Sequence, residues 1–155
     1  MRKLTVTAVF LSLLIFWASL VPVFAGDSLY GKVTEVKSAS LVTFDYGDGQ
    51  YELHLIGIEV PRDGPIATKA TEFVSNLVLG KNARMRFEGR TENGEMMVRL
   101  FTADPDIGIK EIGVELVRSG LARRLKGFDF KYGELAAAEK EAQGAQRGLW
   151  AEDPQ

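Results

Sequence analysis

The sequence predicts a mainly β fold with added helices (α+β), built as one small barrel. Five short segments are rich in β-branched and aromatic residues, and a helical pattern stands between the third and the fourth. Two further helical patterns follow the fifth segment. This order is that of a five-stranded Greek-key barrel of the OB type with three helices. A length of 155 residues, 46% hydrophobic and 26% charged, suits one globular domain and excludes a disordered chain.

The first 25 residues have the pattern of a signal peptide. Arg2 and Lys3 precede a nearly uncharged apolar run, and Val23-Phe24-Ala25 supplies a cleavage site. We therefore expect residues 1–25 to be a signal peptide and residues 26–155 to be the domain, exported to the periplasm or secreted. An uncleaved membrane anchor is the alternative, because about twenty apolar residues span a bilayer. The chain has no cysteine, so the exported domain would be held together by its core without disulfides.

The strand segments are separated by turn residues. The first of them, residues 30–36, alternates apolar and polar side chains as a half-buried strand does. Gly47-Asp48-Gly49 and Glu92-Asn93-Gly94 supply turns between later segments. The first three segments should form an antiparallel meander. The expected strands cover residues 30–36, 41–46, 51–58, 83–88 and 96–101.

The helical segments carry apolar residues at helical spacing and end near glycines. Pro65 opens the first helix and Gly80 ends it, as these residue types commonly do. Gly120 closes the second helix, and the third runs towards Gly148-Leu149-Trp150. The apolar positions of the second and third helices are Ile112, Leu116, Val117, Tyr132, Leu135, Ala138 and Ala142.

Three motifs in order resemble those of the thermonuclease family, the staphylococcal nuclease-like domains. Residues 57–61, Gly-Ile-Glu-Val-Pro, resemble the family's Gly-Ile-Asp-x-Pro loop. Residues 116–122 resemble its Leu-Val-Arg-x-Gly-Leu-Ala helix end, and residues 138–142 with 148–150 resemble its C-terminal closure. The resemblance spans nearly all of the expected domain, and it implies the same OB barrel with three helices.

The resemblance also implies a chemistry against which each position can be compared. Enzymes of the family cleave phosphodiester bonds in DNA and RNA with one calcium ion, held in part by two aspartates. A glutamate activates water and two arginines clamp the phosphate, because a hard cation needs oxygen ligands and the developing charge needs fixed cations. In this sequence, Ser40 and Glu59 stand at the aspartate positions, Arg62 at the glutamate, and His54 and Glu95 at the arginines.

These departures predict a catalytically degenerate domain. Only Glu59 survives as a metal ligand, so we expect no calcium, no other cofactor and no catalytic residues. The domain would then act as a monomeric binding module for a nucleic acid, another anionic ligand or a protein at the barrel face. The first alternative is an active endonuclease that uses calcium, in which Asp63 replaces the lost glutamate and Arg90 or Arg99 the lost phosphate clamp. The second is a membrane-tethered interaction domain, if the signal segment stays attached.

A basic stretch with interleaved aromatic residues offers a second candidate surface. Such a composition occurs where single-stranded nucleic acid stacks on a protein, although a solvated loop packed on the last helix is the alternative. The chain as a whole has 21 acidic and 19 basic residues, which argues against strong nonspecific binding of nucleic acid. The ligand-binding candidates in this stretch are Arg123, Arg124, Lys126, Phe128 and Lys131.

Two positions carry charges opposite to those of the family, and this exchange predicts a contact. Arg62 replaces an acid and Glu95 replaces an arginine, and both flank the same cleft in the family fold. We therefore predict that Arg62 and Glu95 form an ion pair across the cleft, the alternative being that the loop of Arg62 turns into solvent. His54 is expected to be a packed or hydrogen-bonded side chain on its strand.

Overall fold

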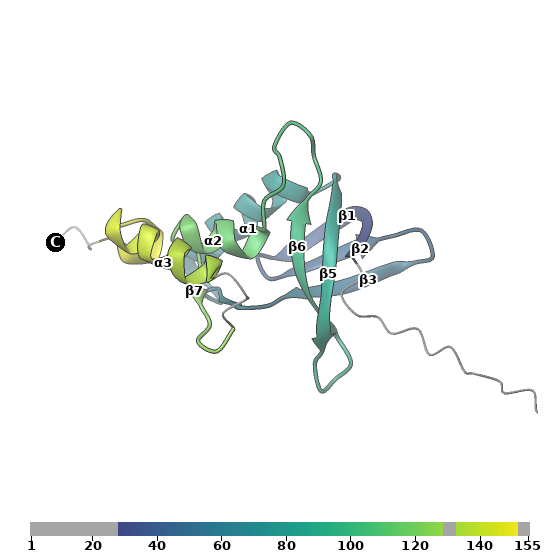
Figure 1. Ribbon diagram of the computed structural model, residues 1–155, viewed down its shortest axis with the longest axis horizontal. Coiled ribbons are helices and arrows are strands. Elements are labelled where there is room, and N and C mark those ends of the chain that lie inside the picture. Colours follow the sequence, from purple (N-terminus) through teal and green to yellow (C-terminus); the bar gives the residue numbers. More distant parts are fainter. Residues whose placement is uncertain (1–27, 129–132, 152–155) are drawn as a thin grey trace, which may run out of the picture.

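The computed structural model describes residues 28–128 and 133–151, and five of its strands close into a barrel (Figure 1). The barrel order is β1-β2-β3-β6-β5, with β3 and β6 parallel and the other pairs antiparallel. This arrangement confirms the predicted barrel and its three-strand meander. The barrel strands are β1 (Ser28–Ser38), β2 (Leu41–Asp45), β3 (Gln50–Leu55), β5 (Asn82–Arg90) and β6 (Met96–Thr102).

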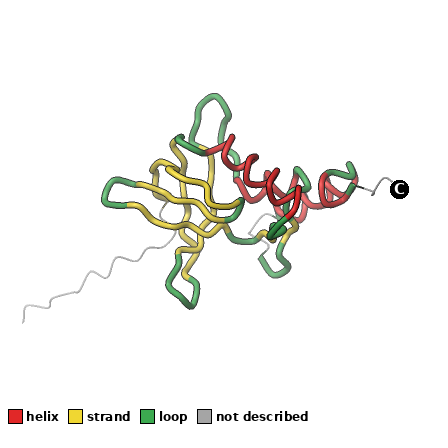
Figure 2. The backbone as a smooth tube through the Cα atoms, turned by 180° about the vertical axis from the view of Figure 1, so that it is seen from behind, coloured by secondary structure: helices red, strands yellow, loops and turns green. Residues whose placement is uncertain are grey.

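Three α-helices form a second body beside the strands, as the tube view shows in red (Figure 2). They are α1 (Gly64–Val78), α2 (Ile112–Arg118) and α3 (Glu134–Gly144), followed by the short 3-10 turn Gly148–Trp150. Within the described ranges no helix is long and apolar enough to cross a membrane. The predicted signal peptide and the predicted start of the third helix at Tyr132 lie outside the described residues.

The third predicted strand is shorter than expected, and a second small sheet takes up its end. β3 stops at Leu55, and Gly57 adopts a positive φ of 79°, which turns the chain out of the barrel. Ile58–Glu59 then forms β4, which pairs antiparallel with β7 (Arg123–Arg124). The basic stretch therefore begins as a strand, whereas the sequence offered no strand signal there.

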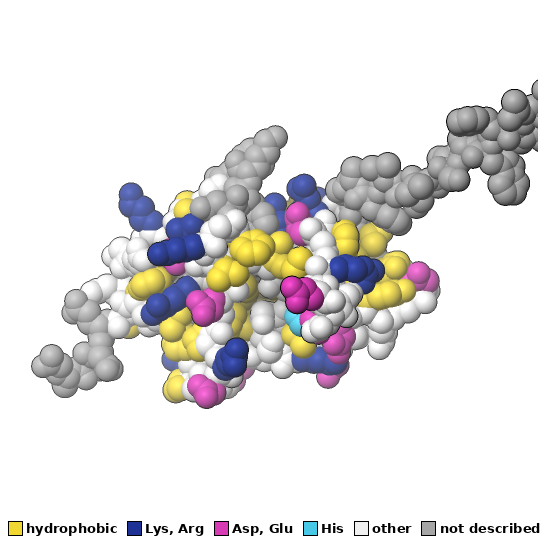
Figure 3. Space-filling view, turned by 90° about the horizontal axis from the view of Figure 1, so that it is seen from below, with side chains coloured by type: hydrophobic (Ala, Val, Ile, Leu, Met, Phe, Trp, Pro, Cys, Tyr) yellow, Lys and Arg dark blue, Asp and Glu magenta, His cyan; other side chains and the backbone are white. Residues whose placement is uncertain are grey.

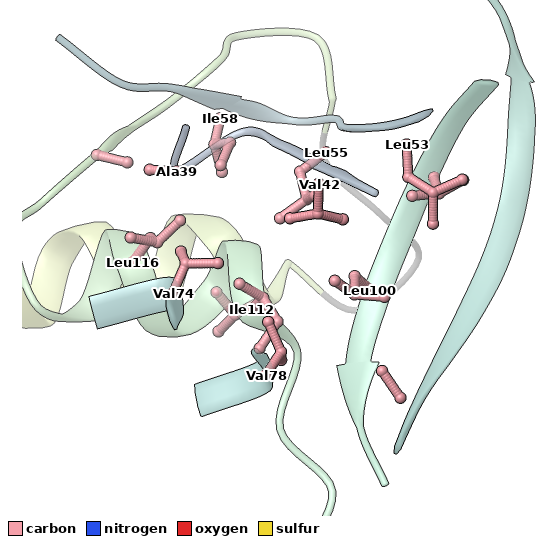
Figure 4. Packing of buried hydrophobic residues seen from close by; sticks show 14 of the residues in the cluster. Ala39, Val42, Leu53, Leu55, Ile58, Val74, Val78, Leu100, Ile112 and Leu116 are labelled. Atoms are coloured by element: carbon pink, nitrogen blue, oxygen red, sulfur yellow. The ribbon is translucent and has the colours of Figure 1, made fainter. Parts of the chain in front are cut away.

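The core lies where the helices meet the inner face of the barrel (Figure 4). Val74 and Val78 of α1 and Ile112 and Leu116 of α2 are fully buried, and Figure 4 shows them facing the barrel interior that Leu100 helps to line. Helices α1 and α2 thus cover one end of the barrel. The turns between β2 and β3 and between β5 and β6 point away from them (Figure 1).

Two glycines join the end of α2 to the C-terminal turn at very short range. The backbone N–H of Leu149 donates to the carbonyl oxygen of Gly120 at 2.8 Å. A Cβ on Gly120 would lie 2.1 Å from the carbonyl oxygen of Arg147, and one on Gly148 would lie 2.2 Å from that of Gly120. This backbone contact requires glycine on both sides, and it places Leu149 beside the small β4–β7 sheet.

Candidate ligand cleft

A cleft of about 580 Å³ opens where the small β4–β7 sheet meets the β1–β2 turn and the C-terminal turn. Ser40 lies on one wall, and β4 and the loop after it supply Glu59 and Arg62. Arg123 of β7 and Leu149 close the remaining side. A hollow of about 260 Å³ adjoins it, sharing Ser40 and Arg62 and reaching α1. Three of the five positions singled out by the family resemblance therefore line one cleft.

The other two positions lie together outside the lining of this cleft. His54 is on β3 and Glu95 directly precedes β6, and their Nε2 and Oε1 atoms are 3.6 Å apart. Because β3 and β6 run parallel as neighbours, the end of the β5–β6 turn is carried alongside β3. The Nε2 atom of His54 is buried and has no hydrogen bond among the described residues, so the imidazole packs without a hydrogen bond at this atom.

The predicted ion pair between Arg62 and Glu95 is wrong. No ion pair within 4.0 Å joins these two described residues, because the turn itself holds Glu95 beside β3. The N–H of Glu95 donates to the Thr91 hydroxyl at 3.1 Å, and that hydroxyl donates to Glu95 Oε2 at 3.2 Å. Arg62 is exposed in the loop before α1 and makes no hydrogen bond or ion pair within the described part of the chain. The alternative, in which the two side chains do not meet, matches the structure, where Arg62 is exposed and lines the cleft.

The cleft carries more positive than negative charge. Glu59 is the one acid in its lining, and its backbone is in register with that of Arg123 across the β4–β7 ladder, with no ion pair between their side chains among the described residues. The guanidinium of Arg123 lies 5.1 Å from the centre of the Trp150 ring, close enough for a cation–π contact. Neither Arg62 nor Arg123 has a carboxylate partner within the described ranges. Figure 3 views the molecule from below, where dark-blue basic side chains are interspersed with magenta acidic ones.

Of the basic stretch, the structure brings one residue into the cleft. Arg123 lines it, whereas Arg124 turns to α3, where Glu139 accepts from its backbone N–H at 3.0 Å and its Nε at 3.4 Å. Lys126 and Phe128 lie exposed on the following loop, and 38% of the Phe128 surface is accessible. Lys131 lies outside the described residues.

The residues considered as replacements for the family's glutamate and phosphate clamp do not line the cleft. Arg90 donates from Nη1 to the carbonyl oxygen of Gly94 at 2.7 Å. Arg99 is engaged by the carboxylates of Glu111 and Glu134, with its Nε donating to Glu111 Oε1 at 3.0 Å. Asp63 is exposed at the start of α1. Within the described residues, no three acidic or histidine side chains gather as a metal site would require.

A model of the family described as "Staphylococcal nuclease homologue" matches residues 52–152. The chain belongs to this family. The match covers four of the five positions compared above, because Ser40 precedes it and only His54, Glu59, Arg62 and Glu95 fall inside. A search of the curated proteins found no match. Members of the staphylococcal nuclease family typically depend on calcium, and the fold of this homologue is the one that the family implies.

Proposed function

We propose that this staphylococcal nuclease homologue is a binding module whose cleft takes an anionic group, and that it does not cleave phosphodiester bonds. One observation carries the proposal: the cleft presents the guanidiniums of Arg62 and Arg123, without carboxylate partners among the described residues, beside the single acid Glu59. Guanidiniums bind phosphate or carboxylate oxygens in pairs of parallel hydrogen bonds. A ligand with such oxygens would supply the anionic hydrogen-bond acceptors that these two guanidiniums lack among the described residues.

The donor set of the cleft does not fit a calcium ion. Calcium takes six to eight oxygen ligands, of which several are normally carboxylates. Here, Glu59 offers a carboxylate and Ser40 a hydroxyl, while Arg62 and Arg123 would repel a divalent cation. Arg62 cannot replace the family's general base either, because a guanidinium stays protonated in proteins. We therefore derive no catalytic step for this cleft.

A single-stranded nucleic acid is the anionic polymer that the surroundings of the cleft favour. The centre of the Trp150 ring lies 5.1 Å from the guanidinium carbon of Arg123, a cation–π contact that favours this position of the guanidinium. Lys126 and the exposed ring of Phe128 follow β7 directly, so a charge and a stacking surface continue from the cleft along the chain. The overall negative charge of the protein then predicts weak binding, and the small number of cationic contacts predicts a modest fall in affinity as salt is added.

Fluorescence anisotropy with a labelled single-stranded oligothymidylate tests this proposal. Arg62→Gln and Arg123→Gln should each weaken binding about tenfold at low salt, because each removes a charge-assisted contact. Arg118→Gln is the matched control, since Arg118 is an arginine at the end of α2 that pairs with Glu115 and Glu141 outside the cleft. Equal losses in all three variants would show a diffuse charge effect and contradict the cleft as the site.

A cleavage assay on the same oligonucleotide separates the module from a nuclease. We expect no cleavage above background with calcium. Cleavage that survives purification, requires calcium and disappears in Glu59→Ala would show that the protein is an endonuclease with a rearranged site.

We infer that the protein is exported, because its first 25 residues carry the charge and apolar pattern of a signal peptide. The mass of the mature protein tests this inference directly. A chain that begins at Gly26 indicates cleavage and release, whereas a full-length chain in the membrane fraction indicates a tethered interaction domain.

A further inference from the structure

A second hollow, of about 280 Å³, lies at the barrel end away from α1 and α2 and shares no residue with the cleft. All five barrel strands or the turns beside them contribute to it, so it is the mouth of the barrel and not a surface dimple. Its volume is near the lower end of the range for small-molecule sites. The apolar lining residues are Leu29, Tyr46, Tyr51, Met85, Phe87 and Met96.

Two tyrosines give this mouth a flat aromatic wall. The rings of Tyr46 and Tyr51 are stacked, with their centres 4.9 Å apart and their planes 27° from parallel. A hydrogen bond with Tyr46, together with desolvation and the nearby charge of Asp48, raises the pKa of Tyr51 to about 12. The hydroxyl of Tyr51 therefore stays protonated across the physiological range, and the stacked rings suit a planar apolar ligand body.

Two methionines give the mouth an adaptable floor and side. Met85 is 1% exposed and closes the barrel below the hollow, while Met96 stands half-buried at the start of β6. Methionine side chains are flexible and polarisable, and they make favourable contacts with aromatic rings. Met97 points to the other face of β6, where its methyl group would lie 3.2 Å from a Cβ on Gly89.

One cation stands at the rim of the mouth. Arg90 is anchored through its hydrogen bond to the Gly94 carbonyl, and its guanidinium lies 5.8 Å from the centre of the Phe87 ring. It has no carboxylate partner among the described residues. Asp48, whose Oδ1 accepts from the Tyr51 hydroxyl at 3.3 Å, holds the opposite charge at the tyrosine wall. A single cation at the rim, with an acid hydrogen-bonded to one of the lining tyrosines, favours a monoanion over a doubly charged phosphate.

We propose that the barrel mouth is a binding site for a small planar aromatic carboxylate. The ring system lies against the wall of Tyr46 and Tyr51 and over Met85, and the carboxylate meets Arg90 at the rim. A two-ring acid fills a hollow of this size. With about a dozen non-hydrogen atoms, such a ligand should bind with a dissociation constant of about 1 mM or below.

NMR of the protein labelled at its methionine methyl groups tests this site with 2-naphthoate as the probe. The methyl signals of Met85 and Met96 should shift and saturate, and that of Met97 on the opposite face of β6 should not. Saturable shifts confined to Met85 and Met96 support the site. No saturation by about 5 mM, or equal shifts at all three methyl groups, overturns it.

The role of Arg90 is tested with a charge-matched pair of probes. Arg90→Gln should weaken binding of 2-naphthoate about tenfold and leave binding of the neutral 2-naphthamide unchanged. Arg86→Gln is the control variant, because Arg86 is on the same strand but pairs with Glu88 outside the mouth. If 2-naphthamide binds the unmodified protein as tightly as 2-naphthoate, the preference for a carboxylate is refuted.

Discussion

His54 and Glu95 face one another at the edge of the barrel, with Nε2 and Oε1 3.6 Å apart. In the staphylococcal nuclease resemblance, these two positions carry the arginines that clamp a phosphate. A glutamate here turns the second position into a partner for the first, so the two no longer aim positive charge at a common ligand. The two positions therefore differ from the family pattern together. In the proposed binding module, the cations available to an anionic ligand are Arg62 and Arg123 of the cleft.

A double-mutant cycle on His54→Ala and Glu95→Ala should show a coupling of about 0.2–1 kcal/mol, because the pair is partly exposed. Thermal or urea unfolding of the four proteins provides the measurement. The same cycle on Arg62→Ala and Glu95→Ala is the control and should show no coupling.

The ion pair between Arg99 and Glu111 should contribute far more to the free energy of unfolding. Their side chains are 10% and 7% exposed, and Arg99 also meets Glu134 of α3. Arg99→Met leaves the carboxylate of Glu111 buried without its main partner, which costs about 3 kcal/mol. Arg118→Met, which breaks exposed pairs, should cost less than about 1 kcal/mol.

The cost of Arg99→Met should also depend on pH. Burial raises the pKa of Glu111 even with Arg99 present. An acid whose pKa is higher in the folded than in the unfolded protein favours folding below the unfolded pKa and loses that contribution as the pH rises through the folded pKa. Without Arg99 the shift grows, so the loss in Arg99→Met should shrink as the pH falls towards 4. A loss that is independent of pH would show that the pKa of Glu111 does not rise further when Arg99 is removed.

The barrel could be predicted from the sequence because its signals are local. Alternation along residues 30–36, the glycine turns and the Pro65 helix start are each visible within a few residues. The β4–β7 sheet could not be predicted, since two-residue strands have no period and their pairing is decided by where Gly57 turns the chain. The same limit applies to the cleft. Sequence comparison selected Ser40, Glu59 and Arg62, but only the fold shows that Arg123 joins them and that Glu95 turns to His54.

Gly120, which contacts the C-terminal turn, should be a backbone position near the cleft where substitution lowers the free energy of unfolding strongly. In Gly120→Ala, the new Cβ would lie 2.1 Å from the carbonyl oxygen of Arg147. The alanine would also have to adopt the positive φ of 70° that Gly120 has. Gly127→Ala is the matched control, since it has a φ of 93° and nothing within 4 Å of the added Cβ. We expect about 1–2 kcal/mol of destabilisation for Gly127→Ala from backbone strain alone. Gly120→Ala should lose at least about 2 kcal/mol more, because the turn must move.

That displacement should also affect the cleft, because Leu149 lines it and Trp150 lies against Arg123. Oligonucleotide affinity measured at a temperature where Gly120→Ala is still folded should fall, while Gly127→Ala binds as the unmodified protein does. If Gly120→Ala keeps full affinity, the C-terminal turn has no part in holding Arg123.

The last prediction concerns the metal that the family normally uses. Ser40→Asp together with Arg62→Glu places two new carboxylates in the cleft beside Glu59 and removes a guanidinium. This is the donor chemistry that calcium requires. The double variant should therefore be stabilised by calcium, by about 1.4 kcal/mol at ten times the dissociation constant, which is a rise of several degrees in Tm. The unmodified protein should show no rise, and magnesium at equal ionic strength should have no comparable effect on either protein.

Thr68→Asp with Arg86→Glu makes the same change in charge on separate elements outside the cleft and should not respond to calcium. A calcium response in the unmodified protein would contradict the proposed loss of the metal site. A double variant that folds but ignores calcium would show that the β4 loop has moved these positions out of the family's ligand geometry.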